Sequence, residues 1–496
     1  MKSYNRIATA TAVAICLAPV TATAQDEEDA HHQIDQIVVT ATPLSRTVEE
    51  LAQPTTVLYG DELVRKQSTS IGETLSQEPG MSSTYFGPVS SRPVIRGQFG
   101  ERVRVLTNGL DSLDASALSE DHQVTVDGLL SSRIEIIRGP ATLLYGSGAA
   151  GGIVNVVDTR FVESPTDNGF SGGLALGADT AVGKRDAAFR GQFATGGIVF
   201  SADYSNRSTD NVEIPGFAES AILRELEEAE GGAEEEAFGV VENTDSETSS
   251  GAVGVSFVSD RGFFGVSFSG FESEYGIPGH HAHGEEDPGA PVPPIEEEEF
   301  VRIDLEQTRV DAKGDYDLDG NFLSGIHFRA AVNDYTHTEL EGAEIGTLFD
   351  VQGLDSRLEL RHAEWGRFEG AIGIQYKRVD FDAIGDEAFV PASDTKRMSL
   401  FIFEEMALSE SWVLQGSARY EDQSISGATL TESYDDGAFG ASIGTVFRPT
   451  DSLRISGNLA LTERHPTTAE LYSVGPHIAA QRYERGAVTL GNGILN

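Results

Sequence analysis

Cysteine, long apolar runs and positive charge are all scarce in this sequence of 496 residues. The single cysteine, Cys16, has no partner for a disulfide, so any bound metal must be held by nitrogen and oxygen ligands. After the first 25 residues there is no run of about 18 apolar residues, which argues against a transmembrane helix. Lysine and arginine total 35 against 79 aspartates and glutamates, a net charge of −44. This balance argues against nucleic-acid binding, because phosphate contacts need cations.

The first 24 residues have the layout of a signal peptide. Lys2 and Arg6 form a basic region, residues 7–20 an apolar core, and residues 22–24 a small-residue cleavage site. Cys16 lies inside this segment, so the mature chain is expected to contain no cysteine. An exported chain that has no apolar helix can enter a membrane only as a closed β-barrel.

Residues 133–158 form the most informative stretch. A β-prone run at 134–137 precedes Arg138-Gly139-Pro140, and a helix-prone piece and a glycine cluster precede a second β-prone run at 153–157. The pattern predicts a strand, a helical turn, a tight glycine turn and another strand. Residues 146–151 also fit the dinucleotide motif G-x-G-x-x-G. That motif must open a helix, whereas β-branched residues follow here, so we reject it.

After residue 160 the chain alternates apolar and polar residues in runs of roughly ten, as barrel strands do. Phe264, Val266 and Phe268 are predicted to share one face. Very short connections alternate with long polar ones, such as those at 338–355 and 424–436. Short turns at one end and long loops at the other are typical of outer-membrane barrels, and a soluble β-sandwich has no reason to keep that alternation.

Residues 133–158, together with PVIRGQFGERVRVLTNGLD at 93–111, resemble the plug domain of TonB-dependent outer-membrane receptors. The resemblance implies an α/β plug domain inside an antiparallel transmembrane β-barrel of about 22 strands. The expected organisation is then the signal peptide at 1–24, a flexible acidic tail at 25–48, a plug at 49–160 and a barrel at 161–496. We count only about 13 or 14 strands, and Asn496 is not the aromatic residue that usually ends such barrels. A C-terminally truncated chain is therefore expected.

A short β-prone run ended by a proline precedes the plug. On the resemblance, Ile37, Val38, Val39, Thr40 and Ala41 form a TonB box, which would add as a strand to the sheet of an energising inner-membrane complex of the TonB type. The expected location is the outer membrane of a Gram-negative cell. The expected partners are this complex and outer-membrane lipid, with no nucleic acid, and we expect a monomer.

Residues 280–287 contain three imidazoles and three carboxylates on a Gly/Pro-rich loop: His280, His281, His283, Glu285, Glu286 and Asp287. Such a set suits a borderline divalent metal such as Zn²⁺ better than Ca²⁺ or Mg²⁺, which prefer oxygen ligands. The loop is therefore interpreted as a metal-capture segment. The alternative is a solvated acidic loop with chance histidines.

Four segments look like the zinc-uptake subgroup of these receptors: residues 119–122, 276–283, 356–362 and 467–477. The subgroup implies a buried zinc site formed by an Asp-His pair of the plug and by a Glu and a His of the barrel. The plug pair matches Asp121 and His122. For the barrel, Glu344 and His477 are the choices, with Glu341 or Glu339 as alternatives to Glu344. Without the resemblance, Asp121-His122 would be interpreted as an ordinary surface turn.

The hypothesis is thus a receptor that takes up a divalent metal, most simply Zn²⁺, which is its transported ligand and not a prosthetic group. Haem or siderophore uptake is the alternative, because His465 lies in a partial match to a haem-receptor motif. A passive porin and an acidic adhesion barrel are alternatives of another class. The absence of G-x-S-x-G and H-E-x-x-H motifs predicts a transporter rather than an enzyme.

Overall fold

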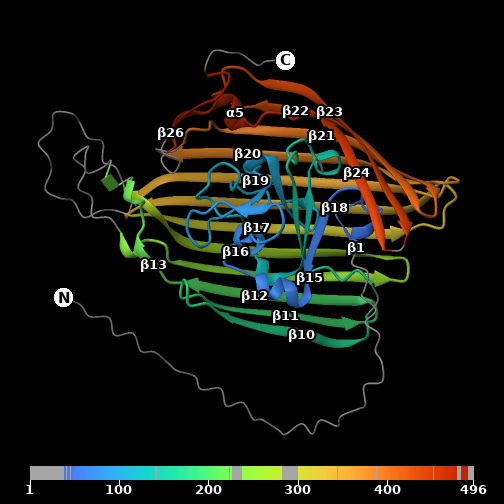
Figure 1. Cartoon of the computed structure of the whole chain (residues 1–496), viewed down its shortest axis with the longest axis horizontal. Helices are drawn as coiled ribbons and strands as arrows, with labels where there is room; N and C mark the ends of the chain where they lie inside the picture. The colour runs from blue at the N-terminus through green and yellow to red at the C-terminus, as the bar shows by residue number, and fades with distance from the viewer. Residues whose placement is uncertain are drawn as a thin grey trace, which may run out of the picture. The chain divides into compact units, whose positions relative to one another are not determined.

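Long antiparallel strands lying side by side dominate the computed structural model (Figure 1). The structure describes residues 38–40, 42–44, 46–139, 142–164, 166–222, 224–225, 237–281, 300–342, 344–385, 388–450, 452–477 and 482–489. The large sheet has 13 strands, and neighbours in the following series are hydrogen-bonded to each other. They are β10 (Gly169–Ala178), β11 (Arg185–Thr195), β12 (Ile198–Thr209), β15 (Ser246–Ser259), β16 (Gly262–His281), β17 (Phe300–Asp317), β18 (Leu323–Glu341), β19 (Glu344–His362), β20 (Phe368–Gly385), β21 (Ser393–Ser409), β22 (Trp412–Ser426), β23 (Tyr434–Thr450) and β24 (Leu453–Thr462).

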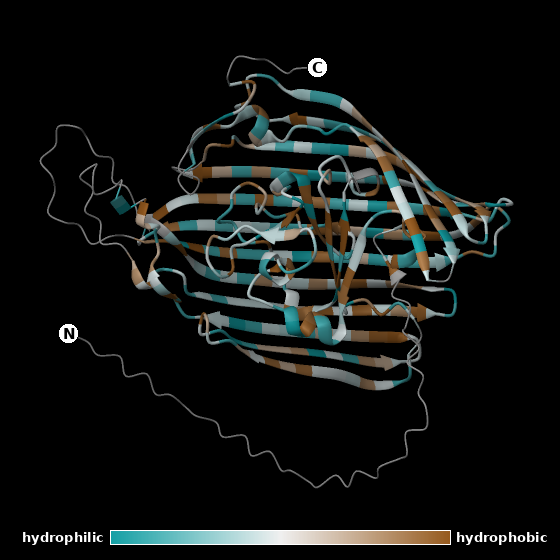
Figure 2. Cartoon of the chain, viewed as in Figure 1, coloured by the Kyte–Doolittle hydropathy of each residue, from teal (hydrophilic) through white to brown (hydrophobic). Residues whose placement is uncertain are grey.

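Apolar and polar residues alternate along these strands (Figure 2). Phe264, Val266 and Phe268 are exposed on the outer face of β16, as predicted, whereas Ser267 and Ser269 are buried on the inner face. A soluble sandwich would bury its apolar row, but this sheet exposes that row and turns its polar row inward, as a membrane barrel does. The predicted fold class, a plug domain with an antiparallel barrel sheet, is confirmed.

The strands are longer than the sequence predicts. Residues 338–355, predicted as a long loop, belong to the β18–β19 hairpin, in which Glu341 pairs with Glu344. Strands β22 and β23 likewise take up parts of the predicted loop at 424–436. The error has a physical cause: where a strand extends beyond lipid, both its faces can be polar, and the alternating signal disappears although the ladder continues.

Smaller elements lie in the connections at the other end of the strands from the tight turns. β13 (Val212–Phe217) pairs with β14 (Phe238–Val241) between β12 and β15. After β24 come α5 (Thr468–Tyr472) and the pair β25 (Val474–His477) and β26 (Arg482–Arg485). Among the described residues, no helix has the length and apolarity needed to span a bilayer.

The plug is built on a five-stranded sheet in the order β3-β8-β9-β6-β7. Its strands are β3 (Thr55–Tyr59), β6 (Val103–Thr107), β7 (Leu110–Asp111), β8 (Ser131–Arg138) and β9 (Gly152–Asp158). The short helices α1 (Gly60–Lys66), α2 (Ile71–Leu75) and α3 (Thr142–Tyr145) and the hairpin β4 (Met81–Ser83) and β5 (Pro93–Ile95) complete it. Leu63 of α1 and Leu75 of α2 pack on Ile134, Ile136 and Val154 of the sheet.

The order predicted for residues 133–158 is confirmed as β8, α3 and β9. Ser70 caps α2, because its side chain accepts a hydrogen bond from the backbone N–H of Glu73. Helix α1 has no side-chain cap. The helix begins at Gly60, whose φ of +53° turns the chain into the helix without a side-chain cap.

The described part of residues 25–48 is folded, in contrast to the predicted flexible tail. β1 (Val38–Val39) pairs with β2 (Arg46–Thr47), and Val39 and Leu44 are buried in an apolar cluster. That cluster includes Leu144 of the plug and Phe401 of β21, so the segment is part of the plug–barrel contact. Residues 1–37, which hold the predicted signal peptide and the start of the tail, lie outside the described residues.

The glycine turn after α3 seats the plug on the barrel wall. The backbone N–H and the hydroxyl of Ser147 donate to Oε1 of Glu421 on β22, at 3.3 Å and 2.6 Å. Arg357 of β19 and Arg419 of β22 donate to the backbone carbonyl of Leu144. This turn is fixed on the barrel by two buried acceptors. The Leu144 carbonyl accepts from two guanidinium groups, and the Glu421 carboxylate accepts from a hydroxyl.

Ser147→Ala should loosen the plug at this turn by about 1–2 kcal/mol, since it removes a hydrogen bond to a charged acceptor. We expect faster backbone hydrogen exchange at residues 144–148, measured by mass spectrometry of the full chain in detergent. Ser132→Ala is the matched control, because the Ser132 hydroxyl donates only within the plug, to the carbonyl of Val157. Equal exchange in both variants would show that the Glu421 contact does not hold the plug.

Candidate metal centre

A plug turn at residues 119–123 meets barrel strands near the ends of β16 and β18 that are remote from the tight turns. The hydroxyl of Tyr275 on β16 donates to the backbone carbonyl of Asp121 and accepts from the N–H of Gln123. Ser90 of the plug donates to the carbonyl of Glu120. These bonds fix the turn from both sides, and they fix the direction of the His122 side chain between them.

His122 meets His337 and Glu339 of β18. The three side chains are buried, and one ligand atom from each lies within 4.8 Å of the others. Oε1 of Glu339 lies 3.4 Å from Nε2 of His122 and 3.6 Å from Nε2 of His337. Ligand atoms about 2.1 Å from a tetrahedral zinc ion are roughly 3.4 Å apart, so these spacings fit a shared ion.

The hydrogen bonds around the two imidazoles leave Nε2 of each turned to the cluster. Nδ1 of His122 donates to the backbone carbonyl of Ala115, 3.1 Å away. A carbonyl can only accept, so Nδ1 carries the proton and Nε2 of the neutral ring is free to bind a metal. Nδ1 of His337 lies 3.1 Å from the hydroxyl of Tyr335. Within the described part of the chain, Nε2 of His337 and Oε1 of Glu339 have no hydrogen-bond partner.

The aromatic ring of Phe349 on β19 covers the pair. It lies edge-on to both imidazoles, with ring centroids 5.0 Å from His122 and 5.4 Å from His337. Two imidazoles and one carboxylate in a dry pocket can bind Zn²⁺ or another divalent transition metal. They supply no thiolate or thioether sulfur, which Cu(I) prefers.

The charge of the cluster favours a cation. Burial disfavours the imidazolium form of His122, but the carboxylates of Asp121 and Glu339 outweigh that cost and raise the pKa of His122. The carboxylates that favour a proton on His122 would also favour a metal ion in its place, so the proton and the metal compete for the site.

The predicted ligands Asp121 and His477 lie next to this cluster and are joined by Ser119. The Ser119 hydroxyl donates to Oδ1 of Asp121 and lies 2.7 Å from Nε2 of His477. His477 stacks on Phe389, and its Nδ1 lies 3.2 Å from Glu484. Burial lowers the pKa of His477 in spite of the Glu484 carboxylate, so this imidazole is neutral. The structure thus places the two residues beside the cluster but outside the group of three.

Glu344, the first choice for the barrel carboxylate, is not brought to the site. It is exposed at the start of β19, and the carboxylate in the cluster is that of the alternative Glu339. Glu344 was chosen because residues 338–355 were predicted as a loop, and they are a hairpin. Sequence reasoning also missed His337. The spacing His337-x-Glu339 was the available signal, because residues two apart on a strand share a face.

Most of the predicted capture loop lies outside the described residues. His283, Glu285, Glu286 and Asp287 lie outside the described residues, as do the side chains of His280 and His281 at the end of β16.

Two other histidines are held by partners. His465, the candidate for haem, is buried, with Nδ1 2.9 Å from the Tyr434 hydroxyl and Nε2 3.2 Å from the carbonyl of Glu421. Both ring nitrogens are therefore engaged, which disfavours an axial haem ligand. His362 stacks on Trp365 next to a tight turn, far along β19 from the cluster.

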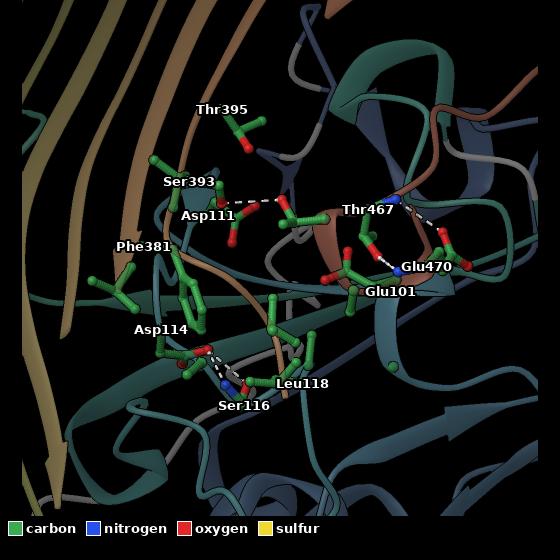
Figure 3. A pocket seen from close by; sticks show the side chains of 18 of the residues that line it. Glu101, Asp111, Asp114, Ser116, Leu118, Phe381, Ser393, Thr395, Thr467 and Glu470 are labelled. Carbon is green, nitrogen blue, oxygen red and sulfur yellow. Dashed lines mark hydrogen bonds between the residues drawn. The ribbon is translucent and has the colours of Figure 1, made fainter. Parts of the chain in front are cut away.

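A cavity of about 570 Å³ lies between the plug and the barrel. Plug residues 111–118 form one wall, and barrel residues such as Phe381 and Lys377 and the segment 466–470 form the others (Figure 3). Ala115, which accepts the hydrogen bond of His122, lines this cavity. The cavity is large enough for a small organic chelate, and Ala115 connects it to the metal cluster.

The predicted TonB box is held inside. The N–H and hydroxyl of Thr40 donate to Oε1 of Glu135 on β8, at 2.9 Å and 3.0 Å. Arg329 of β18 donates to the carbonyl of Thr40. Ile37 and Ala41 lie outside the described residues. A partner that takes this segment as a strand must first break these contacts.

Two family descriptions match the chain. Residues 47–153 match the TonB-dependent receptor plug domain, and residues 237–495 match the TonB-dependent receptor-like β-barrel.

Individual relatives match over smaller parts. A hemin receptor of Yersinia pestis is 34% identical over 141 residues, which are 28% of this chain and 20% of that protein. The copper transporter OprC has a similar structure (TM-score 0.67, 15% identity), with 85% of this chain and 65% of that one covered. The FrpB iron transporter from Neisseria meningitidis is also similar (TM-score 0.65, 11% identity), with 83% and 64% covered. The chain thus spans less than two thirds of each of these proteins.

Glu339→Gln should lower the pKa of His122, because only one carboxylate, that of Asp121, then opposes the lowering of the pKa by burial. The imidazolium would lose its proton at a lower pH than in the parent. The measurement is an NMR titration of ¹³C-labelled histidine in the metal-free full chain, with His122→Gln to assign the signal. Glu404→Gln is the control. It removes a carboxylate next to His362 and should leave the titration of His122 unchanged. An unchanged or higher pKa in Glu339→Gln would contradict the described geometry.

Proposed function

Because the chain belongs to the TonB-dependent receptors, a family of outer-membrane transport receptors, we propose that it takes up a metal-containing cargo. The observation that carries this proposal is the buried group of His122, His337 and Glu339 at the boundary between plug and barrel. Family membership supports a transporter rather than an enzyme.

For the ion itself we propose a divalent transition metal, with Zn²⁺ as the first candidate. The ligand atoms are nitrogen and oxygen, and their spacing suits a tetrahedral ion. Asp121 and His477 are proposed to join the site when the ion arrives. The Ser119 hydroxyl that now lies between them would give way, since a cation attracts both side chains more strongly than a hydroxyl does.

The alternative cargo is an iron complex, haem or a siderophore-type chelate. Two of the three relatives support this alternative over free zinc, because they are described as a hemin receptor and an iron transporter, whereas the third is described as a copper transporter. The cavity of about 570 Å³ beside the cluster offers room for such a molecule. Arg92, Arg104, Lys377, Arg397 and Arg485 line it and can pair with an anionic chelate, although acidic residues line it as well.

The energy source is proposed to be an inner-membrane complex of the TonB type that takes residues 37–42 as an added strand. The described residues of this segment, 38–40 and 42, lie in the plug–barrel contact, where Val39 is fully buried. A passive porin or an adhesion barrel needs neither a plug nor such a segment, so both are disfavoured.

His122→Ala and His337→Ala should each weaken Zn²⁺ binding by more than the roughly 10–100-fold that loss of an outer-shell partner costs. The measurement is calorimetric titration of the full chain with Zn²⁺, repeated with Fe²⁺ and with haem. His362→Ala is the matched control, because that histidine lies far from the cluster. Parent-like Zn²⁺ affinity in both cluster variants would overturn the metal site, and saturable haem binding without Zn²⁺ binding would favour the alternative cargo.

Deleting residues 37–42 should abolish uptake of the bound cargo by intact cells but leave its binding to the purified protein unchanged. The reason is that the segment is needed for energy coupling and does not touch the metal cluster. Uptake of radiolabelled cargo measures the first effect and calorimetry the second. Uptake that survives the deletion would indicate a porin.

A further inference from the structure

The polar contacts of the segment that follows the proposed TonB box run to the barrel, while its Leu51 packs in the apolar cluster that the plug shares with the barrel. We call residues 46–52 the brace. It comprises β2, the 3₁₀ turn η1 (Val48–Glu50), and Leu51 and Ala52. Leu51 and Ala52 are almost fully buried. Along the chain, the brace lies between residues 37–42 and β3, the first strand of the plug sheet.

Five consecutive barrel strands each contribute one side chain to the brace. The guanidinium of Arg46 pairs with Glu369 of β20 and, at 2.8 Å, with Glu405 of β21. The side chain of Gln415 on β22 accepts from the N–H of Ala52 and donates to the carbonyl of Glu50, at 2.9 Å and 2.8 Å.

The other two strands hold backbone carbonyls of the brace. Arg448 of β23 donates to the carbonyl of Glu49 at 2.6 Å, and Arg454 of β24 donates to the carbonyl of Leu51. These barrel side chains also support one another, because Gln415 donates to Glu405 at 2.7 Å. Most of the bonds have a charged donor or acceptor, which makes them stronger than neutral ones.

The contacts before and after the brace are of another kind. Upstream, Thr40 is bound mainly by Glu135 and Arg133 of the plug, with one bond from Arg329 of the barrel. Downstream, β3 pairs with β8 inside the plug. A pull on residues 37–42 travels along the backbone, so it loads the barrel-bound brace before it reaches β3.

We propose that the brace is a mechanical stop. Residues up to 45 can be drawn out by a partner while the plug sheet stays seated, and the plug is opened only when the barrel releases residues 46–52. This device limits the length of chain that is exposed at low force. The inference rests on the proposed function for the source of the pull, but the stop itself is a property of the free protein.

Single-molecule pulling tests the stop without cargo or partner. The full chain is held by its barrel in a lipid nanodisc, and a Gln36→Cys handle in a Cys16→Ser background is pulled. Residues 37–45 extend to about 30 Å and residues 46–54 to a further 30 Å or so. We expect a first event for the upstream segment and a second event, about 30 Å later, for the brace.

Arg46→Gln should move the second event to lower force and leave the first unchanged. Arg65→Gln, an exposed arginine of α1, is the matched control and should change neither event. If Arg46→Gln does not assemble, Arg448→Ala with Arg454→Ala removes two other donors and should act in the same direction. A single-step extension through residue 54 in the parent, or equal forces in the variants, would overturn the stop. Zinc binding plays no part in this measurement. If the zinc site proved wrong, the two extension events would still support the stop.

Discussion

The inward-facing polar row of the large sheet is the constraint on which the structure depends. A sheet with its apolar row facing lipid turns arginines, glutamates and amides inward, and each of these buried groups needs a partner. Much of the partnership comes from the plug backbone. Asn333 of β18 donates to the carbonyl of Leu113, and Gln307 of β17 donates to that of Ser112. Arg357 and Arg419 donate to the carbonyl of Leu144. The plug and the barrel wall are therefore specified together, because these hydrogen bonds join one to the other.

The fold could be predicted where the signal is local. In residues 133–158, the spacing of glycines and β-branched residues predicts a strand, a turn and a second strand. Phe264, Val266 and Phe268 show the alternation expected of a barrel strand. Strand length could not be predicted in the same way. A strand that continues beyond lipid keeps its ladder but loses its apolar face, so residues 338–355 look like a loop although they form a hairpin. The pairing of β1 with β2 could not be predicted either, because Val39 is buried by residues that are distant in sequence.

The candidate site shows the same division. The Asp121-His122 pair was found through a family resemblance that is local in sequence. His337 was missed, although its spacing from Glu339 puts both on one face of a strand. The decisive fact is that the plug turn at 119–123 meets the end of β18, and this depends on how the plug sits within the barrel. No pattern within either segment contains that information. The choice of Glu344 failed for the same reason, since a correct hairpin register is needed to see that it points away.

One strand, β18, contacts both functional regions of the molecule. Arg329 reaches Thr40 and packs against Gly109, and further along the same face His337 and Glu339 meet His122. The separation along the strand is about 27 Å at the usual rise per residue. Side chains on one face of a strand recur only at every second residue, or roughly every 7 Å. A plug that slides by less than this distance would therefore not meet an equivalent row of side chains. Plug movement along this wall is therefore an all-or-none step, in which the contact of Arg329 with Gly109 and the contact of His122 with the histidine cluster are lost or kept together.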